Sequence, residues 1–195
     1  VDAPLNLKFL SGGSGLTEML SLDQAKRLNF IRSFSDYSES YDQLLIDVSA
    51  GAEDSSLNII SAADRVLVVL VNEPTSFMDA FTLIKACNLE YGYKEFCVAI
   101  NMAYSEMQAI QNFNKFQAIV NKFYDVKLHY VGHITSRNTI KQSILNRKPV
   151  VLDSKNKDII LLFENIYTKI LSSPINVHSG IKFFYKNSNK HIKEA

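Results

Sequence analysis

Residues 66–88, VLVVLVNEPTSFMDAFTLIKACN, contain the two patterns that decide the fold of this chain. The first six residues form an uninterrupted apolar run rich in β-branched side chains. Such a run is typical of a strand that is buried on both faces of a parallel sheet. From residue 75 onward, apolar side chains recur at steps of three and four residues, the period of a helix with one buried face. These side chains are Phe77, Met78, Phe81, Ile84 and Cys87. A strand followed directly by a helix predicts one unit of an α/β fold.

Similar patterns recur along the chain and predict its fold class. Further apolar, strand-like runs lie at 44–46, 96–100 and 128–131. Helical periodicity follows these runs in 105–123, 139–146 and 159–171. Strands that alternate with helices predict an α/β fold, with a mostly parallel sheet and helices on both faces.

The predicted helix after residue 105 has both a start signal and a buried face. Ser105 and Gln108 stand at capping-box spacing, which satisfies exposed N–H groups at a helix start. The apolar stripe that we expect to face the core consists of Met107, Ile110, Phe113, Phe116, Val120 and Phe123.

Composition limits the class of protein. The chain has 195 residues, of which 47% are hydrophobic and 21% charged, so it can fill the core of one globular domain. The formal net charge of +1 gives no general reason to expect a nucleic-acid partner. Cys87 and Cys97 are the only cysteines and have no companion at metal-ligand spacing, so we expect reduced core thiols in a cytoplasmic protein. No apolar run is long enough to span a bilayer.

The glycine-rich stretch LSGGSG, at residues 10–15, resembles a phosphate-binding loop only in part. A P-loop requires a lysine and a Ser or Thr directly after the last glycine. Here Gly15 is followed by Leu16, Thr17 and Glu18. The sequence therefore favours a tight glycine turn over a phosphate cradle.

Asp47 and Gly51 follow the predicted strand 44–46, and two interpretations are open for them. In an open parallel sheet, ligands bind beyond the carboxyl ends of the strands. A carboxylate there can hold Mg²⁺ through water, and a nearby glycine lets the backbone approach a phosphate. Alternatively, Asp47 caps a turn and Gly51 supplies an unusual φ angle.

Five segments together resemble one protein family. YDQLLIDVSAGAED (41–54) resembles the Walker B and switch II segment of the MinD/ParA ATPases, and more narrowly of their flagellar MinD-like branch. Four other segments agree with this branch in order and approximate spacing. They are LSGGSGLTEM (10–19), VVLVNEPTSFMDAFTLIK (68–85), FCVAINMAYSE (96–106) and VHSGIKFF (177–184).

The resemblance implies roles for particular residues. Asp47 would be the Walker B carboxylate that orders Mg²⁺ and water, and Gly51 would lie in switch II. Asn101 matches the asparagine that contacts the adenine base, although the residue alone is equally consistent with a backbone cap. The start of the helix near 75 would lie where two protomers sandwich the nucleotide. Its residues there are Glu73, Pro74, Thr75 and Asp79, and Asp79 has the alternative role of capping with Ser76.

Three features depart from the family pattern or resist assignment. The lysine-containing P-loop of the family does not occur in the 195 residues, so we expect an N-terminally incomplete P-loop NTPase fold whose ATPase activity is uncertain. The later turn is altered to GHITSR (132–137), where we expect His133 in a surface loop. The stretch DQAKRL (23–28) resembles a motif that stimulates the partner GTPase, but its position favours an ordinary helix.

The last residues differ in composition from the rest. We expect a MinD-like domain at 1–172, followed at 173–195 by a linker and a basic amphipathic tail. In the tail, Ile181, Phe184 and Tyr185 would enter the headgroup boundary while Lys182 meets anionic lipid. A frayed, solvated end is the alternative.

The resemblance implies a regulator of flagellar number or placement. In its full-length form it would bind ATP and Mg²⁺, form a homodimer when ATP-bound, and associate peripherally with the anionic inner face of the cell membrane. The implied partners are a flagellar signal-recognition-type GTPase, a flagellar transcriptional activator or a switch-complex protein, and no nucleic acid. The alternatives are a nucleotide-independent interaction module, or another MinD/ParA branch that acts in septum placement or DNA partition.

Overall fold

The computed structural model describes residue 4 and residues 7–10, 24–34, 37–48, 54–176 and 182–183. The chain divides into two compact units. The first draws its residues from 1–48, 53–62 and 180–195, and the second from 49–52 and 63–179.

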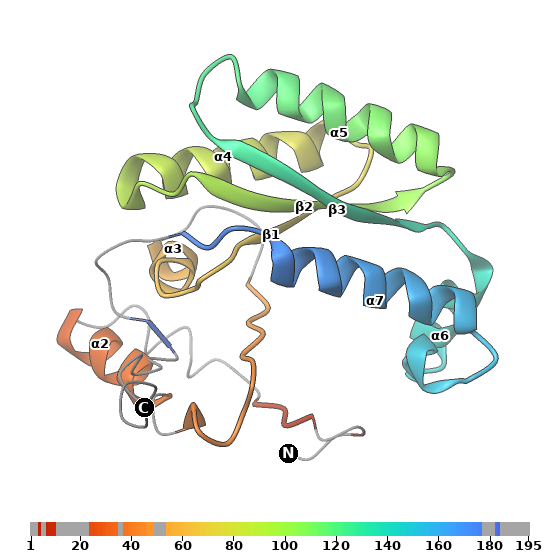
Figure 1. Cartoon of the computed structure of the whole chain (residues 1–195), viewed down its shortest axis with the longest axis horizontal. Coiled ribbons are helices and arrows are strands. Elements are labelled where there is room, and N and C mark those ends of the chain that lie inside the picture. The colour runs from red at the N-terminus through yellow and green to blue at the C-terminus, as the bar shows by residue number, and fades with distance from the viewer. Residues whose placement is uncertain are drawn as a thin grey trace, which may run out of the picture. The chain divides into compact units, whose positions relative to one another are not determined.

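The second unit contains a parallel three-stranded sheet with the order β1-β2-β3. Its strands are β1 (Leu67–Leu70), β2 (Glu95–Ala103) and β3 (Lys127–Thr135). The long helices are α4 (Pro74–Tyr91), α5 (Glu106–Val120) and α7 (Lys157–Ser172). The short elements are α6 (Asn138–Leu145) and the 3₁₀ turn η2 (Val150–Leu152). In Figure 1, α4 and α5 cover one face of the sheet and α7 covers the other. The predicted α/β class, with a parallel sheet and helices on both faces, is confirmed.

Local signals explain where the helices begin and end. Gly92 stops α4 in a left-handed conformation with φ of 69°, as expected of a helix C-terminus. At the start of α5, Gln108 N–H donates to Ser105 Oγ at 3.2 Å, which confirms the predicted capping interaction. In a capping box the side chain of the fourth residue also accepts the N–H of the N-cap residue itself. Here Gln108 Oε1 accepts instead the N–H of Tyr104, one residue before the N-cap, at 2.8 Å.

The predicted apolar stripe of α5 is only partly buried. Phe113, Phe116 and Val120 lie in the core, but Met107 and Phe123 are 71% and 67% exposed. Met107 is two residues from the buried Ala109, and two residues on a helix differ by about 200° in direction. The helix ends before Phe123. Spacing at threes and fours therefore identified the helix but not the limits of its buried face.

The core of the second unit lies on both faces of β2. Cys97 and Ala99 pack with Val131 of β3 and Ile166 of α7. Because side chains alternate along a strand, Phe96, Val98 and Ile100 point to the opposite face, the one that α4 and α5 cover. This two-sided burial accounts for the continuous apolar run in the sequence.

The first unit has a small core of its own. Its described residues include the helices α2 (Gln24–Ser33) and α3 (Asp54–Ile60), and α2 confirms the predicted helix over DQAKRL from Gln24 onward. The buried residues of its core are Ile31, Ile59, Ala62 and Phe183. The Phe34 and Phe183 rings meet edge to face at 5.4 Å between centroids.

The predicted strand at 44–46 is wrong. Residues 43–48 form no strand within the part of the chain that the structure describes. Ile46 and Val48 pack against the core of the first unit, whereas Leu45 is 92% exposed. Only one side of the segment is buried, and an apolar run alone does not specify a hydrogen-bonding partner.

Candidate functional site

The carboxyl end of β2 has an irregular backbone at Asn101 and Met102. The pairing of β2 with β3 shifts register between Ile100 and Ala103. Met102 has a φ of 56°, a conformation that a side chain with a Cβ adopts at a cost of about 1 kcal/mol. Asn101 Oδ1 accepts the Met102 N–H at 2.9 Å and so holds this conformation. Strained backbone of this kind is concentrated at functional sites.

This arrangement leaves one polar group of Asn101 available. Its Oδ1 is used by Met102, but Nδ2 has no hydrogen-bond partner among the described residues. The side chain is partly buried and lies at the sheet edge where ligands bind in α/β folds. The amide can therefore donate to a ligand acceptor, such as a ring nitrogen of a base, without losing an existing bond.

The start of α4 lies at the same edge, because the carboxyl ends of β1 and β2 meet there. Glu73 is the N-cap residue but makes no side-chain cap, and Pro74 opens the helix. Ser76 Oγ accepts the Val71 N–H at 3.1 Å. The alternative in which Ser76 pairs with Asp79 is therefore not what the structure contains. Glu73, Thr75 and Asp79 are exposed at this edge.

The end of β3 is held by Arg137. Its Nε donates to Thr135 Oγ1 at 2.7 Å, and its guanidinium forms an ion pair with Asp158 at the start of α7. The hydrogen bond from Arg137 holds the pKa of Asp158 below its usual value. His133 lies inside β3, half-buried, with its Nδ1 3.1 Å from Tyr130 Oη. The expectation of a surface loop at His133 is therefore wrong, since β3 continues to Thr135.

The predicted grouping of Asp47 and Gly51 with Asn101 is not tested by the structure. Asp47 is exposed, lies in the extended segment 43–48 and belongs to the first unit, whereas Asn101 belongs to the second. Gly51 is outside the described residues. Within the described residues, no three His, Cys, Asp or Glu side chains are grouped as metal ligands. The role of Asp47 in ordering Mg²⁺ through water stays a prediction.

Comparison with known proteins identifies the family. No protein-family model matches the chain. The antiactivator FleN of Pseudomonas aeruginosa is 31% identical over 190 residues, which cover 96% of this chain and 68% of FleN. This chain belongs to the flagellar MinD-like family. The flagellum site-determining protein YlxH of Helicobacter pylori is 26% identical over 195 residues, covering 95% of this chain and 60% of YlxH. The chain thus spans about two thirds of the length of FleN and about three fifths of the length of YlxH.

The tail residues of this flagellar MinD-like protein are described only in part. Lys182 is half-buried, and its neighbour Phe183 is 5% exposed in the core of the first unit. Ile181, Phe184 and Tyr185 lie outside the described residues, so their membrane contact stays a prediction. None of the helices that the structure describes is long and apolar enough to cross a membrane.

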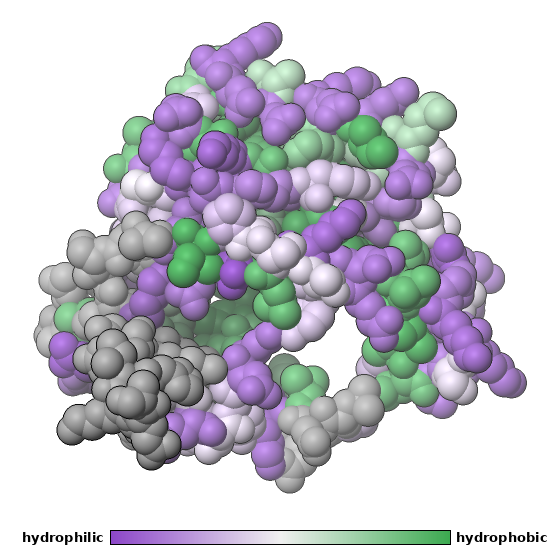
Figure 2. All heavy atoms as spheres, viewed as in Figure 1, coloured by the Kyte–Doolittle hydropathy of each residue, from purple (hydrophilic) through white to green (hydrophobic). Residues whose placement is uncertain are grey.

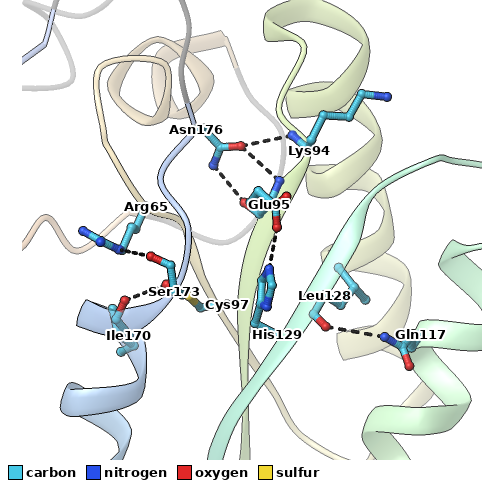
Figure 3. A network of polar contacts seen from close by, with 10 residues as sticks. All are labelled: Arg65, Lys94, Glu95, Cys97, Gln117, Leu128, His129, Ile170, Ser173 and Asn176. Atoms are coloured by element: carbon cyan, nitrogen blue, oxygen red, sulfur yellow. Dashed lines mark hydrogen bonds and ion pairs between the residues drawn. The ribbon is translucent and has the colours of Figure 1, made fainter.

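A polar network that the sequence did not reveal lies at the opposite, amino end of the sheet in this family member (Figure 3). Asn176 Oδ1 accepts the N–H groups of Lys94 and Glu95, both at 3.0 Å. Its Nδ2 donates to the Glu95 carbonyl at 2.8 Å. The Glu95 side chain extends to His129, with 2.5 Å between Oε2 and Nε2. Asn176 thereby fixes the chain beyond α7 to the first residues of β2.

The end of α7 is attached to the same edge. Arg65 Nε donates to the Ser173 carbonyl at 3.0 Å, and a second guanidinium nitrogen donates to the Leu171 carbonyl at 2.9 Å. Cys97 Sγ lies 3.0 Å from Ser173 Oγ, and burial raises the pKa of this thiol. A raised pKa leaves little thiolate, so Cys97 has a structural role. The partners are separated by 76 to 108 residues, and no local pattern predicts such pairs.

Proposed function

We propose that this protein regulates the number or placement of flagella as an ATP-dependent, dimerising and membrane-associated switch. The observation that carries the proposal is its identity of 31% to an antiactivator over 96% of the chain. The name of the second relative, a flagellum site-determining protein, supports the same process. Localisation on the cytoplasmic face of the membrane is part of this proposal.

The geometry around Asn101 supports nucleotide recognition. In the proposed complex, Asn101 Nδ2 donates to the adenine base while Oδ1 continues to hold the Met102 N–H. Asp47, an exposed carboxylate, orders the water around Mg²⁺, and Gly51 lies in the segment that senses the γ-phosphate. ATP supplies the phosphoanhydride bond whose hydrolysis resets such a switch. The exposed residues at the start of α4 would face the second protomer of a homodimer.

The relative's designation as an antiactivator supports a flagellar transcriptional activator as the partner. A flagellar signal-recognition-type GTPase and a switch-complex protein are the other proposed partners. The basic tail, through Ile181, Lys182, Phe184 and Tyr185, would hold the protein at an anionic membrane surface. Weak anchors of this kind gain strength when dimerisation doubles their number.

A nucleotide-independent interaction module is the second candidate. No G-K-[ST] loop occurs within the 195 residues, and this candidate requires that the protein made by the cell also lacks one. The two candidates differ in a single measurable property, which is the affinity of the protein made by the cell for ATP and Mg²⁺.

The test is a titration of that protein with a fluorescent ATP analogue, using wild type, Asn101→Ala and the control Asn114→Ala. Asn114 is an exposed residue of α5. Loss of one hydrogen bond to the base should weaken binding by about tenfold in Asn101→Ala, and Asn114→Ala should bind as wild type. Binding that is equal in all three proteins would remove Asn101 from the site. No binding in any of them would support the interaction module. Counting flagella in cells without the gene tests the regulatory role separately.

A further inference from the structure

A basic and apolar surface lies on α6 and the turn that follows it. We name it the α6 patch and define it by Lys141, Ile144, Leu145, Arg147 and Lys148. Ile144 and Leu145 are 70% and 73% exposed, and α6 contains no buried residue. Around the helix, Lys141 lies between Ile144 and Leu145, and the half-buried Ile140 lies one turn before Ile144 on the same side. In Figure 2, hydrophobic residues lie beside hydrophilic ones at the corner where Figure 1 draws α6.

The segment that contains the α6 patch carries a strong excess of positive charge. Residues 137–157 include six cationic side chains and one acidic side chain, Asp153. Arg137 is paired with Asp158. The other five cations make no side-chain hydrogen bond or ion pair with the residues that the structure describes; they are Lys141, Arg147, Lys148, Lys155 and Lys157. Asp153 Oδ1 accepts the Lys155 N–H within its own turn, and its single negative charge leaves the five cations in excess.

Backbone and side-chain hydrogen bonds fix the turn that carries Arg147 and Lys148. Arg147 has a φ of 52°, where glycine is the favoured residue. This conformation ends α6 and brings Lys148 N–H to the Ser143 carbonyl at 2.9 Å. Asn156 Nδ2 closes the following turn with a bond of 3.0 Å to the Val150 carbonyl. Arg147 thus places a cationic side chain at a position whose backbone favours glycine, directly beside Lys148.

We propose that the α6 patch binds the anionic headgroup surface of a membrane, with Ile144 and Leu145 in the headgroup boundary and the free cations at the phosphates. The inference deepens the membrane association in the proposed function but rests on different residues from the tail. In Figure 1, α6 lies beyond the carboxyl end of β3, at one end of the second unit, which suits insertion into a headgroup layer. Its unpaired cations complement anionic lipid, and each contributes on the order of a fivefold gain in partitioning.

The test is flotation of the protein made by the cell with two kinds of vesicle, phosphatidylcholine alone and phosphatidylcholine mixed with phosphatidylglycerol. Ile144→Ser with Leu145→Ser should lower binding to the anionic vesicles by about tenfold or more. The matched control is Leu89→Ser with Ile119→Ser, two residues of α4 and α5 that are 64% and 42% exposed. This control should bind as wild type.

Arg147→Gly separates membrane binding from folding. Glycine suits the backbone at this position, so the free energy of unfolding should be unchanged or higher, while anionic vesicle binding falls about fivefold. A tail variant, Lys186→Glu with Lys190→Glu and Lys193→Glu, tests the proposed tail anchor independently. Loss of binding in the α6 variants supports the inference whatever the tail variant does.

Other results would overturn the inference. Unchanged vesicle binding in the α6 variants, together with lost binding in the tail variant, would leave the tail as the anchor and remove the α6 patch. Wild-type vesicle binding combined with a lost effect on the flagellar activator would assign the patch to a protein partner. Equal loss in the Leu89 and Ile119 control would show that any exposed apolar pair has this effect.

Discussion

Replacing Asn176 by alanine should destabilise the protein more than any exposed substitution. Asn176 is 5% exposed, and its side chain makes three hydrogen bonds to the backbone at the start of β2. At about 1 kcal/mol for each bond, the loss is about 3 kcal/mol. Two part-buried N–H groups left without acceptors raise the cost, and water entering the space lowers it. We therefore expect about 2–4 kcal/mol.

The assay is urea denaturation followed by circular dichroism. With an m value of about 2 kcal/mol per molar urea, the midpoint should fall by about 1–2 M. Asn114→Ala, at an exposed helical position, should shift the midpoint by less than about 0.3 M in either direction. A loss below about 1 kcal/mol for Asn176→Ala would refute the reasoning, because it would mean that the backbone of Lys94 and Glu95 does not depend on this side chain.

Two further predictions concern packing and alkaline pH. A Cβ added at Gly132 would lie 2.8 Å from Ile166 Cγ1 at a φ of 144°, so Gly132→Ala should cost about 2–4 kcal/mol in urea denaturation. Gly92→Ala meets nothing within 4 Å at a φ of 69° and should cost only about 1 kcal/mol; equal losses would contradict the steric argument. Burial raises the pKa of Cys87 from 9.0 to about 12 and that of Tyr130 from 10.0 to about 12. The fold thus favours the neutral forms, and this contribution to stability is complete below about pH 9 and is lost as the pH rises toward 12. Cys87→Ala should flatten part of that decline in urea midpoints measured from neutral to alkaline pH, and an unchanged slope would contradict the assignment to this thiol.

Much of the second unit could be predicted because its signals are local. The apolar run at 66–71 and the helical spacing from 75 to 88 are patterns between residues close in sequence. They correspond to β1 and α4 in the structure. Ser105 and Gln108 are three residues apart, so their capping interaction could also be inferred from spacing. The apolar run at 96–100 likewise placed Asn101 near the carboxyl end of a strand, whereas its role toward a nucleotide was implied by the family resemblance.

Tertiary structure decided the features that depend on distant residues. The run at 44–46 has the composition of a strand, but a strand also requires a neighbour that offers backbone hydrogen bonds. The positive φ of Met102 goes with a register shift of β2 against β3, and such a shift cannot be specified by one strand alone. Among the described residues, Asn101 Nδ2 has no hydrogen-bond partner. Asn176 binds residues 81 and 82 positions away. The sequence by itself therefore determined the order and type of the elements of the second unit, since periodicity and capping act over a few residues. The tertiary structure determined which faces are buried and which polar groups are left available, because both depend on contacts between segments that are far apart in the chain.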